Sequence, residues 1–280
     1  MNNGFQKITE SIFRRHIALP SDHGAWVFLF SPLLIGLFAG GTWTTATTYL
    51  VMAALTVFLL RQPVATVVKV YSRRRSRRDL TAAWFWSLCY SLIGLLALAG
   101  LLHEGYSYLL VLAIPGLLVF CWHLYLVSKR AERRQLGVEI IGSGVLALSA
   151  PAAYWVGVGY PDPLGWLMFA LVWLQSAASI VHAYLRLEQR VLAKTPDIPT
   201  RLKIGRRALF YTTFNLATVT ILAITTRIPI FLPGAYLIQW IETIWGIIHP
   251  AVGVKPTVIG LRQLLVSTLF TLAFIITWKI

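Results

Sequence analysis

The sequence predicts an all-α protein, a polytopic bundle of transmembrane helices with about nine spans. Hydrophobic residues make up 57% of the 280 positions, charged residues make up only 12%, and the apolar residues fall into long runs. A soluble domain usually carries roughly 25% charged residues, and a helix needs about 20 apolar residues to cross the hydrocarbon core. We therefore expect residues 1–280 to form a single integral membrane domain.

Nine apolar runs give the expected spans in order. They cover residues 24–40, 43–60, 81–102, 106–128, 138–157, 163–185, 208–226, 229–248 and 260–278. Pro229, Pro233 and Glu242 interrupt the eighth run, which leaves open whether it crosses fully or is a broken or re-entrant span.

The segment before the first span, residues 1–19, has no long apolar core, so it does not resemble a secretory signal. Phe5, Ile8, Ile12 and Phe13 recur there at helical spacing. This pattern predicts a short interfacial helix that lies on the membrane, followed by a transmembrane bundle over residues 20–280.

The basic residues gather on one side of the expected bundle. With nine spans and a cytoplasmic N-terminus, 23 of the 25 Lys and Arg residues fall in cytoplasmic segments, and only Arg227 and Lys279 fall on the other side. The positive-inside rule therefore predicts a cytoplasmic N-terminus and a C-terminus on the opposite side. It also accounts for the net charge of +15 without a nucleic-acid partner. We expect the basic loops to contact anionic lipid headgroups.

The mouth of the first span holds the first candidate residues, His23 and Trp26, after Leu19-Pro20-Ser21-Asp22. His23 is a candidate acid–base group and Trp26 a candidate ligand contact, close to a helix that Pro32 kinks. The alternative is structural, with Ser21 or Asp22 as an N-cap and Trp26 as an interfacial anchor. Both interpretations stay open.

The end of the second span holds the next candidates, Arg61, Gln62 and Lys69. Arg61 directly follows the apolar run, near the membrane boundary, where a guanidinium is suited to bidentate binding of phosphate or carboxylate. The Arg-rich run at 73–78 is better explained as a topology anchor that touches anionic lipid.

A polar stripe on the sixth span is the strongest physical indication of a site. Ser179, His182 and Arg186 follow one another at spacings of three and four residues, with Ser176 and Arg190 on the same helical face. Such a stripe in a membrane helix faces the protein interior or a wet cavity. We predict Ser179 and Arg186 as ligand contacts and His182 as an acid–base group. The alternative is hydrogen bonding between helices.

Glu139, early in the fifth span, is a further candidate because an ionisable group at this depth is functional by default. It could instead pair with an arginine of the 130–134 loop, and Glu242 could likewise form a salt bridge. The two cysteines, Cys89 and Cys121, lie inside apolar runs without metal-ligand spacing, and no nucleotide or zinc motif occurs. No metal site is predicted.

Several motifs of this chain resemble the YwiC-like family of uncharacterised bacterial membrane proteins. They are Leu19-Pro20, His23-Gly24-Ala25-Trp26, Pro32, Arg61-Gln62-Pro63, the start of span five with Glu139, Ser179 to Arg186, Lys255-Pro256 and Ile259-Gly260. This resemblance supplies no activity to carry over.

A more distant resemblance is to UbiA-type intramembrane prenyltransferases. It implies nine helices and two active loops, after helices two and six, on the cytoplasmic side. Those enzymes use Asp-rich motifs in both loops to hold magnesium against a prenyl diphosphate. This chain instead offers Arg61, Gln62 and Lys69 in one place, and His182, Arg186 and Glu188 in the other. The resemblance therefore implies a UbiA-like scaffold without the usual magnesium–diphosphate site, and the cofactor stays unknown.

Two classes of function follow. In the first, the protein is a divergent prenyltransferase-like enzyme that acts on an isoprenoid- or quinone-like amphipathic lipid in a cavity open to the cytoplasm, with Arg61, Lys69 and Arg186 neutralising an anionic group. In the second, it is a non-catalytic lipid- or cofactor-binding protein, an assembly factor or a transporter. Internal repeats, which are common in transporters, are not evident.

Overall fold

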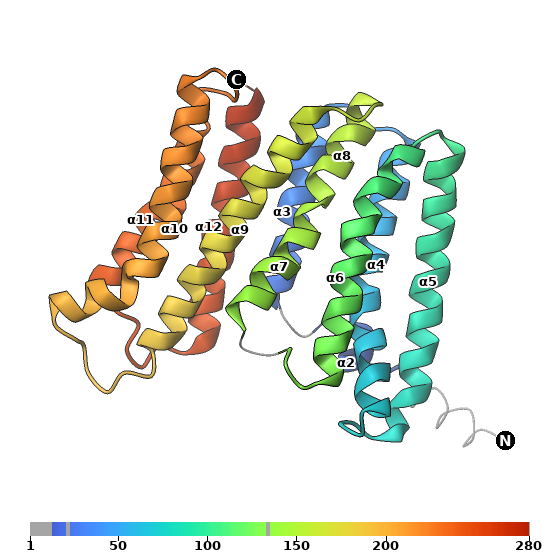
Figure 1. Ribbon diagram of the computed structural model, residues 1–280, viewed down its shortest axis with the longest axis horizontal. Helices are drawn as coiled ribbons and strands as arrows, with labels where there is room; N and C mark the ends of the chain where they lie inside the picture. Colours follow the sequence, from blue (N-terminus) through green and yellow to red (C-terminus); the bar gives the residue numbers. More distant parts are fainter. Residues whose placement is uncertain (1–12, 21–22, 133–134, 280) are drawn as a thin grey trace.

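The structure is a computed structural model that describes residues 13–20, 23–132 and 135–279. This part of the chain is an all-α bundle (Figure 1). Phe5, Ile8 and Ile12 of the predicted interfacial helix lie outside the described residues. The helices are α2 (Arg15–Ala18), α3 (His23–Gly40), α4 (Thr45–Tyr71), α5 (Leu80–His103), α6 (Leu110–Ser128), α7 (Leu136–Ala147), α8 (Ser149–Val158), α9 (Pro163–Gln189), α10 (Ile198–Ile224), α11 (Pro233–Ile248) and α12 (Pro256–Lys279).

Seven helical stretches of the described chain are long and apolar enough to cross a membrane. One of them joins α7 and α8, which are separated only by Leu148. The break lies where Pro151 lacks the N–H that would bond to the Ala147 carbonyl. The shorter helices α3 and α11 run alongside the long ones (Figure 1), so the expected figure of about nine spans agrees with the bundle. α11 is one unbroken helix of 16 residues, with Pro233 at its start.

The second span is longer than its apolar run predicts. The expectation was an end near residue 60, but α4 continues to Tyr71 and contains Pro63. Its last turns stay helical because Ala65, Val67 and Val70 are buried, and Val67 packs with Ile17 of α2 and Ala82 and Ala83 of α5. Hydropathy reports where the hydrocarbon ends, whereas the helix ends where its packing partners end.

The short helix α2 lies against α4 and α5 at one end of the bundle. Gln62 Nε2 donates to the His16 carbonyl at 3.0 Å, and the Tyr90 hydroxyl donates to the Ala18 carbonyl at 3.1 Å. Side chains of α5 also pack around Phe13, whose ring lies 5.8 Å from that of Trp86. These contacts fix the described part of the N-terminal segment to the bundle.

The largest hydrophobic core occupies the half of the bundle away from α2. Its members include Leu33, Trp155, Met168 and Phe270 from four different helices. Close backbone packing holds α3 against α8 there: a Cβ at Gly36 would lie 2.2 Å from the Ala150 carbonyl oxygen. Small residues allow membrane helices to approach in this way. The other half of the bundle holds the cavity described below.

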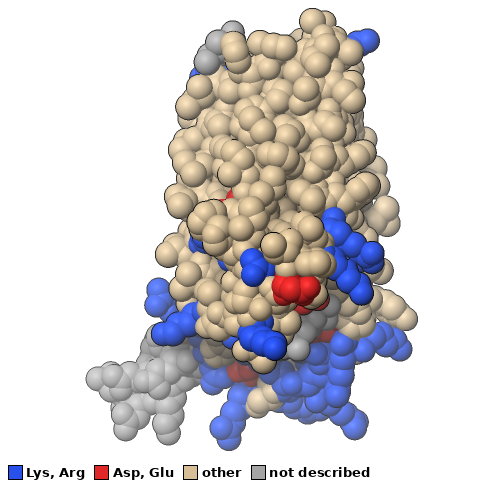
Figure 2. Space-filling model, turned by 90° about the vertical axis from the view of Figure 1, so that its left-hand side faces the viewer, with Lys and Arg blue, Asp and Glu red and all other residues tan. Residues whose placement is uncertain are grey.

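Charge divides the two ends of the molecule. On the face shown in Figure 2, Lys and Arg gather over the lower part, and the upper part is almost free of charge. The end of α12 lies at the upper end and α2 at the lower end (Figure 1). On this face of the folded chain, the separation of basic residues predicted from the sequence is present.

Candidate functional site

A cavity of ≈ 1210 Å³ lies in the basic half of the bundle. It follows the last three turns of α9 and is completed by the first turns of α3, α7, α10 and α12. Residues 182, 186 and 189 of α9 point away from it, toward α11. The cavity therefore borders α9 on two sides, one facing α7 and α10 and the other facing α3 and α12.

The side facing α7 and α10 carries charge. The Tyr184 hydroxyl donates a 2.6 Å hydrogen bond to Glu139 Oε1, which holds one carboxylate at the wall of the cavity. Lys203, Arg206 and Arg207, all exposed, line the same side from α10. We call these three residues the cationic wall. Glu139 thus pairs with a tyrosine here, and not with a described residue of the 130–134 loop.

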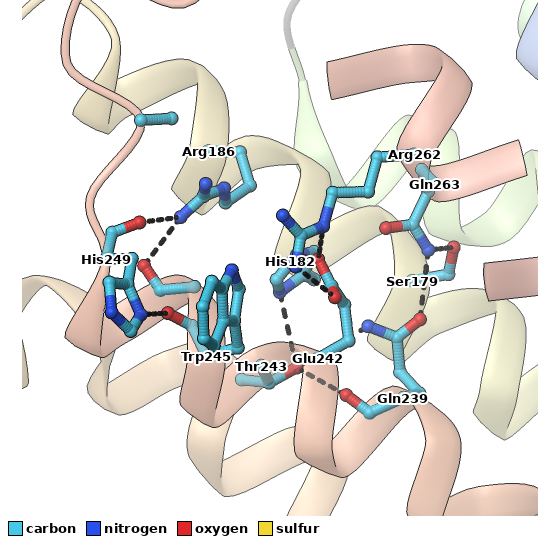
Figure 3. A network of polar contacts seen from close by, with 12 residues as sticks. Ser179, His182, Arg186, Gln239, Glu242, Thr243, Trp245, His249, Arg262 and Gln263 are labelled. Atoms are coloured by element: carbon cyan, nitrogen blue, oxygen red, sulfur yellow. Dashed lines mark hydrogen bonds and ion pairs between the residues drawn. The ribbon is translucent and has the colours of Figure 1, made fainter. Parts of the chain in front are cut away.

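The side facing α3 and α12 has neutral polar groups. Gln263 of α12 donates from Nε2 to Ser179 Oγ at 2.6 Å and to Gln239 Oε1 at 2.9 Å. Ser179 and Gln263 line the cavity, whereas Gln239 of α11 is buried behind them. Three helices are therefore joined by one amide nitrogen (Figure 3).

An ionic group built on the buried Glu242 carboxylate continues this network (Figure 3). Glu242 binds Arg262, with Oε1 2.6 Å from Nε and Oε2 2.8 Å from the terminal nitrogen, and its Oε1 lies 3.7 Å from His182 Nε2. The Thr243 hydroxyl donates to the Gln239 carbonyl at 2.9 Å, so His182 Nδ1, 3.2 Å away, is the donor to Thr243. The salt bridge considered for Glu242 is thus present.

Arg186 binds backbone carbonyls at the end of α11. Its terminal nitrogen donates to Gly246 O at 2.6 Å, to His249 O at 2.8 Å and to Gln189 Oε1 at 2.9 Å. Gln189 donates to the same Gly246 carbonyl at 2.9 Å. A cation at this place satisfies the last carbonyls of the helix and complements its dipole. Arg186 therefore has a structural partner in this conformation.

Arg61 and Lys69 belong to α4 and do not line the cavity. Their charges act on His123 of α6, and Lys69 also acts on Glu132 in the loop that follows. Arg74 binds both oxygens of Glu132, at 2.9 and 3.2 Å. Burial raises the pKa of the Glu132 carboxyl, but the hydrogen bonds and charge of Arg74 lower it, and the net pKa is below the ordinary value. Gln62 is used in binding α2.

The start of α3 holds two further predicted site residues, His23 and Trp26. His23 is the first residue of α3, and its side chain lies outside the described part of the structure. Trp26 packs its ring at 4.9 Å from Phe58 of α4 and 5.7 Å from Phe30. The neighbouring Gly24 borders the cavity. Trp26 thus forms part of the α3–α4 contact.

The cavity brings together two of the predicted site residues, Glu139 and Ser179. His182 and Arg186 lie on the side of α9 that faces α11, away from the cavity. Arg61, Gln62 and Lys69 lie on α4 and form a separate group. Sequence reasoning missed Tyr184, Gln239 and Gln263. The two glutamines carried a usable signal, because an uncharged polar residue inside an apolar run also seeks a polar partner.

The residues present do not fit a magnesium site of the kind expected in the distant enzyme family. Of the charged residues that line the cavity, Glu139 and Glu188 are acidic, and Arg190, Lys203, Arg206 and Arg207 are basic. Magnesium in such sites is held by carboxylates, and excess positive charge repels it. Within the described chain, no group of three His, Cys, Asp or Glu residues is placed to hold a metal ion. The chemistry of this cavity favours an anion.

Comparison with known proteins agrees with the first resemblance. The sequence profile of the YwiC-like protein family matches residues 19–154. The resemblance to the YwiC-like family is confirmed. The uncharacterized protein YwiC of Bacillus subtilis (strain 168) is 27% identical over 161 residues, which are 57% of this chain and 61% of that protein. This chain thus aligns with about three fifths of the YwiC relative's length. The matched region of the family profile begins at Leu19, between α2 and α3, and ends at Tyr154 within α8.

The fold is similar to that of a membrane enzyme. A chain from a structural study of digeranylgeranylglyceryl phosphate synthase in membranes superposes with a TM-score of 0.59, covering 98% of this chain and 100% of that chain at 12% identity. At this identity the likeness concerns the fold alone. This likeness confirms the helix arrangement that the UbiA-type resemblance implied. The superposition also includes α9–α12, which lie beyond the region matched by the family profile.

Proposed function

We propose that this protein binds an amphipathic isoprenoid- or quinone-like lipid in the cavity around α9, with an anionic group of the lipid at the cationic wall. The observation that carries the proposal is the cavity itself: ≈ 1210 Å³, mostly apolar side chains, and Lys203, Arg206 and Arg207 along one side. Cavities that hold small ligands are commonly about 300–1,000 Å³ and combine apolar walls with a few polar groups. An elongated lipid suits the larger volume.

The charge of the cavity supports an anionic ligand. Arginine binds phosphate or carboxylate through a planar fork of donors, and two arginines follow each other on α10. A lipid phosphate at this depth would also lie near the level of ordinary headgroups, because the cationic wall is within three turns of the start of α10.

The orientation is part of the proposal. We infer that the basic end faces the cytoplasm, by the positive-inside rule. In a Cys89→Ser, Cys121→Ser background, a membrane-impermeant maleimide applied to intact cells is expected to label Tyr160→Cys and to leave Arg77→Cys unlabelled until the cells are opened. The reverse pattern would overturn the orientation.

Binding is tested with geranylgeranyl phosphate added to the full-length protein in detergent micelles, with native mass spectrometry as the readout. We expect a one-to-one complex that Arg206→Gln with Arg207→Gln weakens about tenfold, the equivalent of 1.4 kcal/mol. The matched control is Arg77→Gln with Arg78→Gln, which removes two exposed charges at the same end but outside the cavity. Absence of a complex, or equal weakening by both pairs, would contradict the proposal.

A catalytic role is the second candidate, favoured by the likeness of the fold to a membrane enzyme. Because the described chain does not gather three His, Cys, Asp or Glu residues for a metal ion and basic residues outnumber the two carboxylates that line the cavity, such an enzyme would handle the anionic group with arginine and lysine. Incubating the bound lipid with membrane extracts and analysing it by mass spectrometry separates the two roles. Recovery of unchanged lipid supports binding alone, and a product that forms only with the protein supports catalysis.

A further inference from the structure

The side of the cavity away from the cationic wall carries a second, neutral pair of polar atoms. Gln263 Nε2 has both hydrogens engaged, one with Ser179 Oγ and one with Gln239 Oε1. Its carbonyl oxygen Oε1 is therefore the atom left to meet a ligand. In the part of the chain that is described, the Ser179 hydroxyl accepts from Gln263 and donates to no other residue.

This pair is a built site because the atoms behind it fix its orientation. Ser179 is 2% exposed and Gln239 is 1% exposed, so neither side chain can turn freely into solvent. Gln239 in turn donates from Nε2 toward Thr243 Oγ1 at 3.5 Å, and Thr243 is bound by His182. Figure 3 shows the side-chain amide of Gln263 joined by dashed lines to Ser179 and to Gln239. The amide of Gln263 is thus held with its nitrogen inward.

We propose that Ser179 and Gln263 form a subsite for the hydroxyl group of a neutral lipid, an isoprenoid alcohol or a phenol. A hydroxyl both donates and accepts: it can donate to Gln263 Oε1 and accept from the Ser179 hydroxyl. A ketone or an ether can only accept and leaves Gln263 Oε1 without a donor. The subsite uses none of the residues of the cationic wall and lies on the other side of α9.

The surroundings fit the body of such a lipid. Gly24 of α3 and Gly260 of α12 border the cavity on this side, and a Cβ at either glycine would meet nothing within 4 Å. Val27 and Leu264 add apolar surface next to them. A chain or ring that enters between α3 and α12 therefore meets open, apolar walls before it reaches the hydroxyl-binding pair.

The test compares geranylgeraniol with geranylgeranyl methyl ether, which keeps the chain and the acceptor oxygen but lacks the donor. Both are titrated into the full-length protein in detergent micelles and followed by native mass spectrometry. We expect the alcohol to bind about three- to tenfold more tightly than the ether. Equal affinities, or no binding of the alcohol, would overturn the proposal. The result does not depend on geranylgeranyl phosphate or on Arg206 and Arg207.

Variants assign the binding to the two residues. Gln263→Met removes the acceptor for the ligand hydroxyl and is expected to bring the alcohol-to-ether ratio to about one, while Thr268→Ala, exposed on the same helix as Gln263, keeps the ratio. Ser179→Ala removes the donor to the ligand oxygen, which the alcohol and the ether share, and is expected to weaken the binding of both. Thermal unfolding checks that each variant is folded. An unchanged ratio in a folded Gln263→Met variant, or unchanged binding of both ligands in a folded Ser179→Ala variant, would sink the assignment.

Gln239 is a positioning residue, since it touches Gln263 and not the cavity. Gln239→Met removes the acceptor that holds the amide of Gln263, and we expect the alcohol-to-ether ratio to fall. Gln239→Glu keeps an acceptor oxygen and should restore the ratio. A role in stability alone would lower the unfolding temperature of both variants without changing the ratio, and that outcome would contradict the positioning role.

Discussion

Arg262 of α12 binds Glu242 of α11 through two contacts, 2.6 Å between Nε and Oε1 and 2.8 Å between the terminal nitrogen and Oε2. The carboxylate is buried, and the guanidinium is partly exposed and lies 5.6 Å from the ring of Trp245. The pair joins the two last helices of the chain. It also places a negative charge beside His182 of α9, so three helices meet at one carboxylate.

Glu242→Gln should destabilise the bundle by about 1–3 kcal/mol, because it replaces a buried carboxylate that holds one charge-assisted hydrogen bond and one ion-pair contact with Arg262. The measurement is the thermal unfolding of the purified protein in detergent. Glu104→Gln, an exposed acid at the end of α5, is the matched control and should unfold like the unmodified protein. Similar unfolding of both variants would show that the Arg262 pair adds no stability.

Arg186→Met should loosen the end of α11, because the His249 carbonyl loses the Arg186 donor and the Gly246 carbonyl keeps only the donor of Gln189. We expect a loss of about 2–3 kcal/mol in stability and faster hydrogen exchange in residues 246–251. Arg186→Lys should recover part of the protection, since an ammonium can still donate to a carbonyl. Normal exchange together with lost binding of geranylgeranyl phosphate would instead return Arg186 to the ligand-binding role that the sequence predicts.

Local signals predicted most of the fold. The apolar runs and the basic residues can be read from each segment without knowledge of its packing partners. They therefore predicted the spans and the end of the bundle at which the basic residues gather. The extension of α4 beyond Arg61 was not predictable in this way, because the packing of Val67 against α2 and α5 maintains it. Packing partners that are distant in sequence are not visible in the hydropathy of one segment.

The candidate site was predictable only in part. Helical spacing indicated that Ser179, His182 and Arg186 follow one stripe of α9, and all three are buried. Ser179 borders the cavity, whereas His182 and Arg186 turn toward α11. The spacing could not say that α11 would supply carbonyls to Arg186, or that Gln263, 84 residues away from Ser179, would bind it. Arg61 and Arg186 look alike in sequence, each at the end of a span, yet the fold places them in different groups.

Gly36→Ala should destabilise the contact between α3 and α8, since its Cβ would lie 2.2 Å from the Ala150 carbonyl oxygen and 2.8 Å from the Ala153 Cβ. Backbone atoms cannot turn aside, so the helices must separate, at a cost of about 1–3 kcal/mol. Gly142→Ala, on α7 and with nothing within 4 Å of the added Cβ, is the control. It should be neutral or slightly stabilising because alanine favours the helix. Equal unfolding temperatures of the two variants would contradict close α3–α8 packing.

Glu132→Gln should lower stability near neutral pH and lose this effect in acid. In the folded protein, the hydrogen bonds and charge of Arg74 hold the pKa of the Glu132 carboxyl below its usual range, against the effect of burial. A depressed folded-state pKa contributes stability that is fully present above the unfolded value of about 4.3 and is lost as the pH falls through the folded value. The unmodified protein should therefore exceed the variant by roughly 1 kcal/mol at neutral pH. The difference should close below about pH 4. Thermal unfolding of both proteins across this pH range measures it, with Arg74→Gln expected to show the same convergence. A gap that stays constant with pH would mean that the ionised Glu132–Arg74 pair is not its source.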